Sequence, residues 1–211
     1  MSLFTTNRPG KIIGIGRNYK SHAIELGNEI PKKPLFFLKS TSCLLPKDEA
    51  IVIPEGERVD YEGELAVVVS KKQRKVSALD AASAIEGCLV ANDVTARTLK
   101  KPGLPWGLSK SLDTFLPLSE GLVDWFDLKD TPIKTLLNGE VVQSATLDQM
   151  IFSVPELISY LSHCMTLEKG DLILTGTPEG VGPLKQDDVV SVHIEHVGSV
   201  SNPVISQKMD L

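Results

Sequence analysis

The apolar residues of this chain fall into short runs, and this pattern limits the possible folds more than any other feature of the sequence. The runs are separated by Gly, Pro and Asp, which interrupt regular structure. Runs this short, rich in Val, Ile and Leu, are typical of β-strands rather than of helices. We predict strands over residues 11–15, 35–38, 65–69, 88–91, 172–174 and 189–194.

Two segments have the start signal of a helix. Ser77, three residues before an aspartate, precedes an Ala-rich stretch to Glu86, and Gly87 is the predicted C-terminal cap. Ser153, three residues before a glutamate, precedes a second helix with one apolar face. Because strands and helices do not alternate regularly, a doubly wound parallel sheet fits poorly. We therefore predict a β-rich α+β domain with two peripheral helices.

Length and composition predict one globular domain over residues 1–211. The chain has 42% apolar and 23% charged residues, an ordinary globular composition without the signature of disorder. A formal net charge of −5 argues against nucleic acid or an anionic membrane as the main partner. No apolar run approaches the ~20 residues that a membrane span needs.

Cysteine use and the first residues indicate the compartment. Cys43, Cys88 and Cys164 are odd in number and far apart, which argues against a disulfide framework or a cysteine zinc site and favours a reducing compartment. Residues 1–10 lack the basic and apolar regions of a signal peptide. We therefore expect a cytoplasmic protein.

Three carboxylates lie where predicted strands begin or end. Glu62 and Glu64 are two residues apart as the chain enters the strand at 65–69, so their side chains point to the same face, about 7 Å apart. Asp93 closely follows the strand at 88–91. Like charges this close repel one another unless a cation lies between them. Three carboxylates without Cys or His suit a hard divalent cation such as Mg²⁺ or Mn²⁺.

His22 and Glu25 are three residues apart, so one helical turn would bring the imidazole and the carboxylate together. A carboxylate orients a histidine and raises its basicity, as a general base requires. Both this pair and the carboxylate group have plain alternatives, namely an exposed surface pair and a solvated strand edge. The spacing alone does not decide between them.

Read together, these motifs resemble the fumarylacetoacetate hydrolase family, in particular its small acylpyruvase-like branch. The resemblance extends from Ile12 to about Ile205, and it favours the metal site and the histidine pair over the plain alternatives. The matching motifs are Gly16-Arg17-Asn18-Tyr19 with His22 and Glu25, Phe36-Phe37-Leu38-Lys39, Glu62-Gly63-Glu64-Leu65, Asn92-Asp93-Val94-Thr95-Ala96-Arg97, Gly103-Leu104-Pro105-Trp106, Ser109-Lys110-Ser111, Asn138-Gly139-Glu140, Met150-Ile151-Phe152-Ser153, and Leu172-Ile173-Leu174-Thr175-Gly176-Thr177-Pro178-Glu179-Gly180-Val181-Gly182.

The resemblance implies a mixed β-sandwich roll, usually a homodimer, with peripheral helices. It implies Mg²⁺ on Glu62, Glu64 and Asp93, with Mn²⁺ and Ca²⁺ as alternative metals. It also implies that His22 and Glu25 lie on a mobile lid, residues 18–33, that orders over bound substrate.

Four further residues acquire roles from the resemblance. Lys110 is the cationic residue near the bound anion and joins His22 and Glu25 in catalysis. Arg97 and Thr177 shape the substrate site, and Arg17 is assigned to substrate binding. For Lys110 and Arg97, composition alone leaves a surface or ion-pair role as the alternative.

The sequence departs from the family pattern after Arg97. Relatives usually continue with an acidic residue, an aliphatic residue and Gln, whereas this chain reads Thr98-Leu99-Lys100. The Gln contributes to the active site in the branch. We therefore expect Lys100 to line the pocket or its rim and to favour substrates with a negatively charged distal group.

The family reaction that fits these residues is hydrolysis of a C–C bond in acylpyruvate-type β-diketo acids, such as fumarylpyruvate or acetylpyruvate. His22 and Glu25 would deprotonate the attacking water, and the metal and Lys110 would stabilise the pyruvate enolate. Decarboxylation or tautomerisation of oxaloacetate and isomerisation of a 2-hydroxy-dienedioate use a related enolate and are the alternatives. A non-enzymatic β-sandwich module with structural Ca²⁺ is an alternative from another class. It would explain the carboxylates but gives His22, Glu25 and Lys110 no role.

Overall fold

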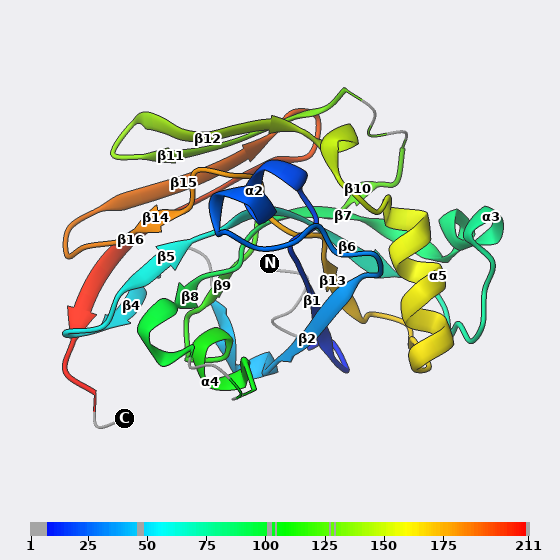
Figure 1. The fold of residues 1–211 in the computed structure, drawn as a ribbon, viewed down its shortest axis with the longest axis horizontal. Coiled ribbons are helices and arrows are strands. Elements are labelled where there is room, and N and C mark those ends of the chain that lie inside the picture. Colours follow the sequence, from blue (N-terminus) through cyan, green and yellow to red (C-terminus); the bar gives the residue numbers. More distant parts are fainter. Residues whose placement is uncertain are drawn as a thin grey trace.

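The computed structural model describes residues 8–45, 49–100, 103, 105–126, 128 and 130–209 (Figure 1). Strands dominate and form four sheets, with short helices at the periphery. The β-rich α+β prediction is confirmed, and all six predicted strands are present. Within the described residues, no helix is long and apolar enough to span a membrane.

The largest sheet has six strands and forms the centre of the fold. Its β1 and β13 strands are parallel, and its other pairs are antiparallel. Every residue of β6 is buried, because β6 has strand neighbours on both sides and packed side chains on both faces. The strand order is β10 (Val123–Asp124), β7 (Ile85–Asn92), β6 (Gly63–Val69), β13 (Leu172–Leu174), β1 (Ile12–Gly16) and β2 (Leu35–Lys39).

Three smaller sheets complete the fold. A five-stranded sheet contains β12 (Glu140–Thr146), β11 (Pro132–Leu137), β15 (Val189–Ile194), β16 (Gly198–Gln207) and β4 (Ile51–Pro54), in that order. A three-stranded sheet contains β14 (Gly182–Pro183), β5 (Val59–Tyr61) and β8 (Thr95–Ala96), and a two-stranded sheet contains β3 (Leu44–Leu45) and β9 (Leu116–Pro117).

Successive side chains of β6 divide the core into two clusters. Leu65, Val67 and Val69 pack with residues of the five-stranded sheet and of α5 (Val154–Cys164). Ala66 and Val68 point the other way, into the second cluster. A central sheet covered on both faces in this way gives the predicted mixed β-sandwich roll.

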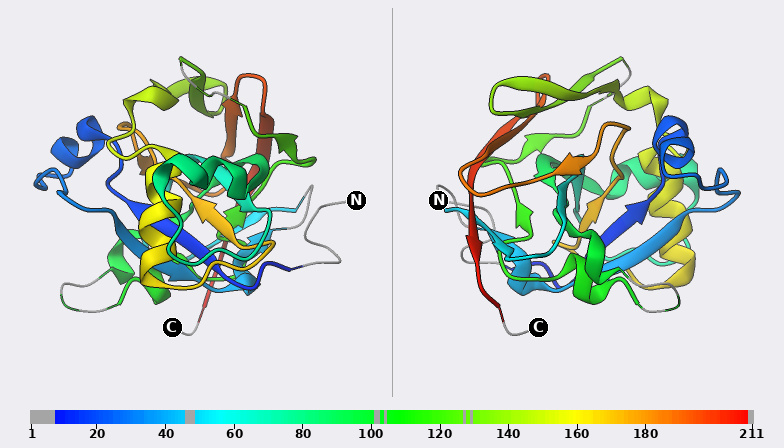
Figure 2. Two further views of the ribbon diagram at one scale, coloured as in Figure 1. Left: turned by 90° about the vertical axis from the view of Figure 1, so that its right-hand side faces the viewer. Right: turned by 60° about the vertical axis from the view of Figure 1, so that its left-hand side comes forward.

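The helix predicted from Ser153 is present as α5. Glu156 Oε2 accepts from the Ser153 backbone N–H at 2.7 Å and from its hydroxyl at 2.6 Å, as in a capping box. The apolar face formed by Leu157, Ile158 and Leu161 is fully buried. α5 lies beside α3 (Ala78–Ala81) at one end of the molecule (Figure 2).

The helix predicted to run to Glu86 is wrong beyond its first turns. It begins as expected, with the Ser77 hydroxyl accepting the Asp80 N–H at 3.2 Å. After α3 and one 3₁₀ turn (Ala82–Ala84) the chain enters β7, which contains both Glu86 and the predicted cap Gly87. Gly87 is needed there for space, because a Cβ atom would lie 2.4 Å from the Val123 carbonyl oxygen. Sheet pairing has overridden the helical tendency of the alanines.

The remaining helical segments are short. α2 projects from the body of the molecule, as the left view of Figure 2 shows. These segments are α2 (Lys20–Glu25), α4 (Gly107–Lys110) and the 3₁₀ turns η1 (Thr41–Cys43), η3 (Arg97–Leu99) and η4 (Leu147–Gln149).

Candidate active site

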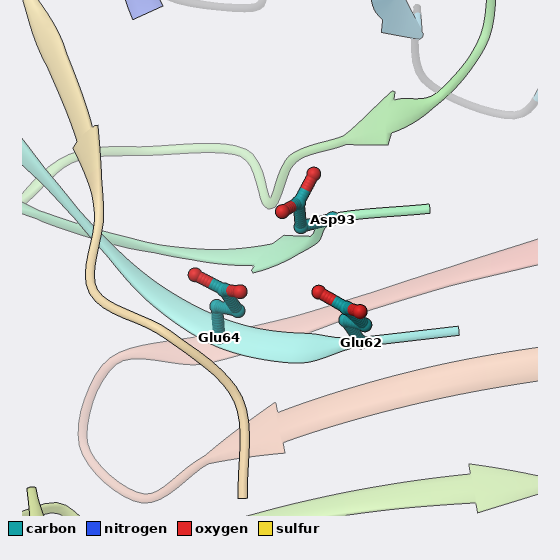
Figure 3. A group of neighbouring side chains, drawn as sticks. All are labelled: Glu62, Glu64 and Asp93. Carbon is teal, nitrogen blue, oxygen red and sulfur yellow. The ribbon is translucent and has the colours of Figure 1, made fainter. Parts of the chain in front are cut away.

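Three buried carboxylates meet where β5, β6 and β7 begin or end (Figure 3). Glu62 lies between β5 and β6, Glu64 is the second residue of β6, and Asp93 follows β7 directly. The Asp93 N–H donates to the Glu62 carbonyl oxygen at 2.8 Å, which fixes the two backbones side by side. One carboxylate oxygen of each residue lies within 4.8 Å of the other two. The structure thus brings the three predicted metal ligands together, away from any solvated edge.

Buried Lys110 and partly buried Arg97 pair with two of these carboxylates. Lys110 Nζ lies 2.7 Å from Glu62 Oε2 and 2.5 Å from Asp93 Oδ2. Arg97 donates to Glu62 through Nη2 and to Asp60 Oδ2 through Nε, the latter at 2.8 Å. Both predicted cationic residues therefore lie in the site, where they form ion pairs with its carboxylates.

Sequence reasoning assigns no role to Lys39, yet its ammonium group is fully buried beside Asp93. Lys39 Nζ lies 2.6 Å from Asp93 Oδ1 and 3.0 Å from the Phe115 carbonyl oxygen. The available signal is a lysine at the end of the otherwise apolar strand β2. Its partner lies 54 residues further along the chain, and spacing does not reveal a contact over that separation.

Among the described residues, Glu64 has no ion-pair partner and accepts the Gly176 N–H at 2.7 Å. Burial and the Asp93 and Glu62 carboxylates raise the pKa of Glu64 well above its ordinary value. Burial acts in the same direction on Glu62, but the ammonium and guanidinium groups beside it prevail and lower its pKa. A divalent cation would supply the positive charge that Glu64 lacks, and the three oxygen ligands suit Mg²⁺, Mn²⁺ or Ca²⁺.

His22 and Glu25 form the predicted pair on α2. His22 Nδ1 lies 3.0 Å from Glu25 Oε2, and the other carboxylate oxygen accepts the Gly180 N–H at 2.9 Å. Only 4% of His22 is exposed, so the alternative of an exposed surface pair is wrong for this histidine. The bond from Gly180 could not be predicted, since it joins residues 155 positions apart.

Hydrogen bonds of the Asn18 side chain fix the chain just before α2. The buried side-chain amide of Asn18 donates to the Thr175 carbonyl oxygen at 2.8 Å and to the Phe152 carbonyl oxygen at 3.0 Å. Its carbonyl oxygen accepts the Phe152 N–H at 2.9 Å. These three bonds fix the chain direction just before the segment that carries His22.

The remaining predicted residues line a small cleft. Trp106 forms part of its wall, and the Lys100 ammonium lies 3.5 Å from the centre of the Trp106 ring. The Thr177 hydroxyl accepts from Gln143 Nε2 at 2.9 Å. The structure thus places Lys100 and the other predicted substrate residues together with the histidine. The cleft is lined by Ile15, Gly16, Arg17, His22, Leu26, Asn28, Phe37, Glu62, Arg97, Lys100, Trp106, Lys110 and Thr177.

Comparison with known proteins gives several enzyme relatives, of which three show the range of reactions. The oxaloacetate decarboxylase of Dictyostelium discoideum mitochondria is 46% identical over 193 residues, covering 87% of this chain and 88% of that protein. The structure of 5-carboxymethyl-2-hydroxymuconate delta-isomerase from Mycobacterium smegmatis is 37% identical with a TM-score of 0.88, covering 96% of this chain and 81% of that one. Fumarylpyruvate hydrolase from Pseudomonas aeruginosa, in complex with Mn²⁺ and pyruvate, is 30% identical with a TM-score of 0.88, covering 94% and 91%.

The family comparison agrees with these likenesses. A family model described as "Fumarylacetoacetate (FAA) hydrolase C-terminal" matches residues 11–205, nearly the whole chain. The expected resemblance is confirmed over the same range in which the motifs occur. This chain belongs to the fumarylacetoacetate hydrolase family.

Proposed function

We propose that the protein is a Mg²⁺-dependent hydrolase that cleaves the C–C bond of acylpyruvate-type β-diketo acids. The observation that carries this proposal is buried His22, which is paired with Glu25 and lines a cationic cleft that also contains Glu62. A hydrolase needs a base that can activate water, and a histidine oriented by a carboxylate meets that need. The similar fold of a fumarylpyruvate hydrolase that binds Mn²⁺ and pyruvate supports it.

The residues divide the reaction between them. A cation held by Glu62, Glu64 and Asp93 would act as a Lewis acid toward the 2-oxo acid end of the substrate. His22 takes a proton from water, and the oxygen attacks the distal carbonyl carbon. The bond from that carbon to the adjacent carbon breaks, and its electron pair forms the enolate of pyruvate. Lys110 stabilises the negative charge of the enolate. Protonation of the enolate then gives pyruvate, and the other product is a carboxylic acid.

A second candidate activity acts on oxaloacetate. The relative with 46% identity is an oxaloacetate decarboxylase, and this reaction, like tautomerisation, uses an enolate without an attacking water. The isomerase relative supports a third candidate, isomerisation of a 2-hydroxy-dienedioate. Each of these would use the same three carboxylates and Lys110.

We also infer a homodimer, which the family resemblance implies. Apolar side chains on α2 and on the edge strand β2 are exposed in the single chain, which supports their burial against a second copy. They include Ile24, Leu35, Phe36 and Leu38. Light scattering should give twice the mass of one chain, and the mass of a single chain would contradict the inference.

A turnover panel tests the proposed reaction. The purified protein, loaded with Mg²⁺, is assayed with acetylpyruvate, fumarylpyruvate, oxaloacetate and a 2-hydroxy-dienedioate. We expect release of pyruvate from at least one acylpyruvate, with the highest kcat/KM of the panel. The Glu64→Gln variant is the control and should be inactive while folded, because it loses a metal ligand. Faster turnover of oxaloacetate than of both acylpyruvates would assign the protein to the second candidate.

A further inference from the structure

Two of the cationic side chains that line the cleft have no anionic partner among the described residues. Arg97 and Lys110 are paired with buried carboxylates. Arg17 and Lys100, in contrast, form no ion pair with any carboxylate of the described residues, although both are only partly exposed. Cations that are partly withdrawn from water without a counter-charge are unfavourable in the empty protein. This arrangement is typical of a site whose anion arrives with the ligand.

Lys100 is held in place by an aromatic ring instead of an acid. Its ammonium lies over the Trp106 ring, which favours the cation without neutralising its charge. Burial, followed by the nearby Lys110, lowers the pKa of Lys100 to about 8; Glu62 opposes this shift, and Arg97 and Arg17 add to it. An anion placed next to Lys100 would relieve this repulsion.

The backbone of Gly16 and Arg17 runs along the wall of the cleft that Trp106 forms. Arg17 has a φ of 59°, a left-handed conformation that a residue with a Cβ atom rarely adopts. The preceding Gly16 lies close to Trp106, because a Cβ atom there would lie 3.0 Å from the Trp106 ring, a tight contact. The chain therefore passes directly against Trp106 and turns sharply, which places Arg17 on the same cleft as Lys100.

We propose that Arg17 and Lys100, with Lys100 held on Trp106, bind a second carboxylate of the substrate, so that the enzyme prefers 2-oxo dicarboxylic acids to equally long acids that end in a methyl group. This inference rests on the proposed function for one point only, namely that the 2-oxo acid end binds at Glu62, Glu64 and Asp93. Of the acylpyruvates considered above, it selects fumarylpyruvate over acetylpyruvate.

Binding is tested with a pair of ligands of equal chain length. 2-Oxoglutarate ends in a carboxylate and 2-oxopentanoate in a methyl group, and both are titrated calorimetrically into the Mn²⁺-loaded protein. We expect Lys100→Gln and Arg17→Gln each to weaken 2-oxoglutarate binding about fivefold, the effect of one partly exposed ion pair. 2-Oxopentanoate binding should stay within twofold. Lys100→Arg should retain the preference, and Lys71→Gln, at an exposed lysine outside the cleft, is the matched control.

Turnover of fumarylpyruvate and acetylpyruvate by the same variants separates this inference from the proposed function. In one outcome, Lys100→Gln and Arg17→Gln lose the preference for 2-oxoglutarate over 2-oxopentanoate, but neither fumarylpyruvate nor acetylpyruvate is turned over. This outcome would support the carboxylate subsite and reject the hydrolase. Turnover of both compounds with an unchanged kcat/KM ratio in Lys100→Gln and Arg17→Gln would overturn the subsite and leave the hydrolase standing. Equal weakening of both 2-oxo acids would also overturn it, because the two cations would then bind the end that the ligands share.

Discussion

Glu64 differs from Glu62 and Asp93 in that it forms no ion pair with an ammonium or guanidinium group in the part of the chain that the structure describes. Lys110 contacts both of the other carboxylates, and their charges are largely balanced before any metal arrives. The remaining unbalanced negative charge is therefore concentrated on Glu64, whose pKa is raised by its burial and by the neighbouring Asp93 and Glu62 carboxylates. A metal ion bound to all three carboxylates would supply the counter-charge of Glu64 and would share Glu62 and Asp93 with their ion-pair partners.

His22 should separate hydrolysis from decarboxylation. Hydrolysis needs a base for the attacking water, whereas loss of CO₂ from oxaloacetate needs an acceptor for the electron pair, which Lys110 and the metal site provide. We expect His22→Ala to lower kcat for acylpyruvate cleavage by ~10²–10⁴, as is typical for removal of a general base, and to lower decarboxylation less. Lys110→Ala should lower both rates. Equal losses in both assays for His22→Ala would mean that His22 does not activate water.

Lys100 should make substrate preference dependent on pH. Because the pKa of Lys100 is lowered to about 8, its positive charge is lost between pH 7 and 9.5. The ratio of kcat/KM for fumarylpyruvate to that for acetylpyruvate should therefore fall over this range, with a midpoint near pH 8. The fields of Glu62, Lys110 and Arg97 act on the end that both substrates share, so their effects largely cancel in the ratio.

The matched control for this pH profile is Lys100→Arg. Arginine keeps its charge throughout the range, so the ratio should stay level up to pH 9.5. A profile of the same shape in Lys100→Arg as in the natural protein would assign the titration to a group other than Lys100.

At the scale of elements, α2 is held by neighbouring loops rather than by its own stability. It has six residues, far fewer than an isolated helix needs in water. Asn18 fixes its start, and Glu25 joins its end to Gly180. The loop between β13 and β14 thus contacts both the predicted lid, through Gly180, and Glu64, through Gly176.

Glu25→Ala should release α2. The lost bond has an ionised acceptor, and such bonds contribute about 1.5–3 kcal/mol, so the exchange of the Ala23 and Leu26 amide hydrogens should be at least tenfold faster. Glu25→Gln retains an acceptor for Gly180 and should give a smaller increase. Glu29→Ala, at an exposed position in the same segment, is the control. Unchanged exchange in Glu25→Ala would show that the bond from Gly180 does not hold the helix.

Local patterns were sufficient for most elements, whereas the residues of the site also required the family resemblance, and its long-range contacts could not be predicted. Alternation predicts that Glu62 and Glu64 share a face, and the i,i+3 spacing predicts the His22–Glu25 pair, since each depends on neighbours in the chain. Lys39 could not be assigned to Asp93, because that contact depends on which strands become neighbours. The helix expected through Glu86 failed for the same reason, since partners in the sheet decide the conformation there.

At the scale of the whole molecule, metal binding should raise the global stability. If the cation binds only the folded chain, a Mg²⁺ concentration 100 times Kd adds about 2.7 kcal/mol, or about 5–10 °C in Tm. Glu64→Gln should abolish this increase. Metal-free Glu64→Gln should melt above the metal-free natural protein, since a carboxyl group with a raised pKa destabilises the folded state at neutral pH. Differential scanning calorimetry with and without EDTA measures both, and a Mg²⁺-induced increase that persists in Glu64→Gln would place the cation elsewhere.

The parallel pairing of β1 with β13 joins Ile12 to Leu172, which lie 160 positions apart in the chain. During synthesis, β1 leaves the ribosome long before β13 and gains this neighbour only after the residues between them have been translated. Until then, β1 and β6 each keep an unpaired edge, which is a template for association with other chains. The Gly176 N–H that holds Glu64 follows β13 in the chain and is made later still. The candidate active site is therefore completed only after β13 and Gly176 have been translated, and nascent chains that stall before Leu172 carry all three carboxylates without the strand that closes the sheet beside them.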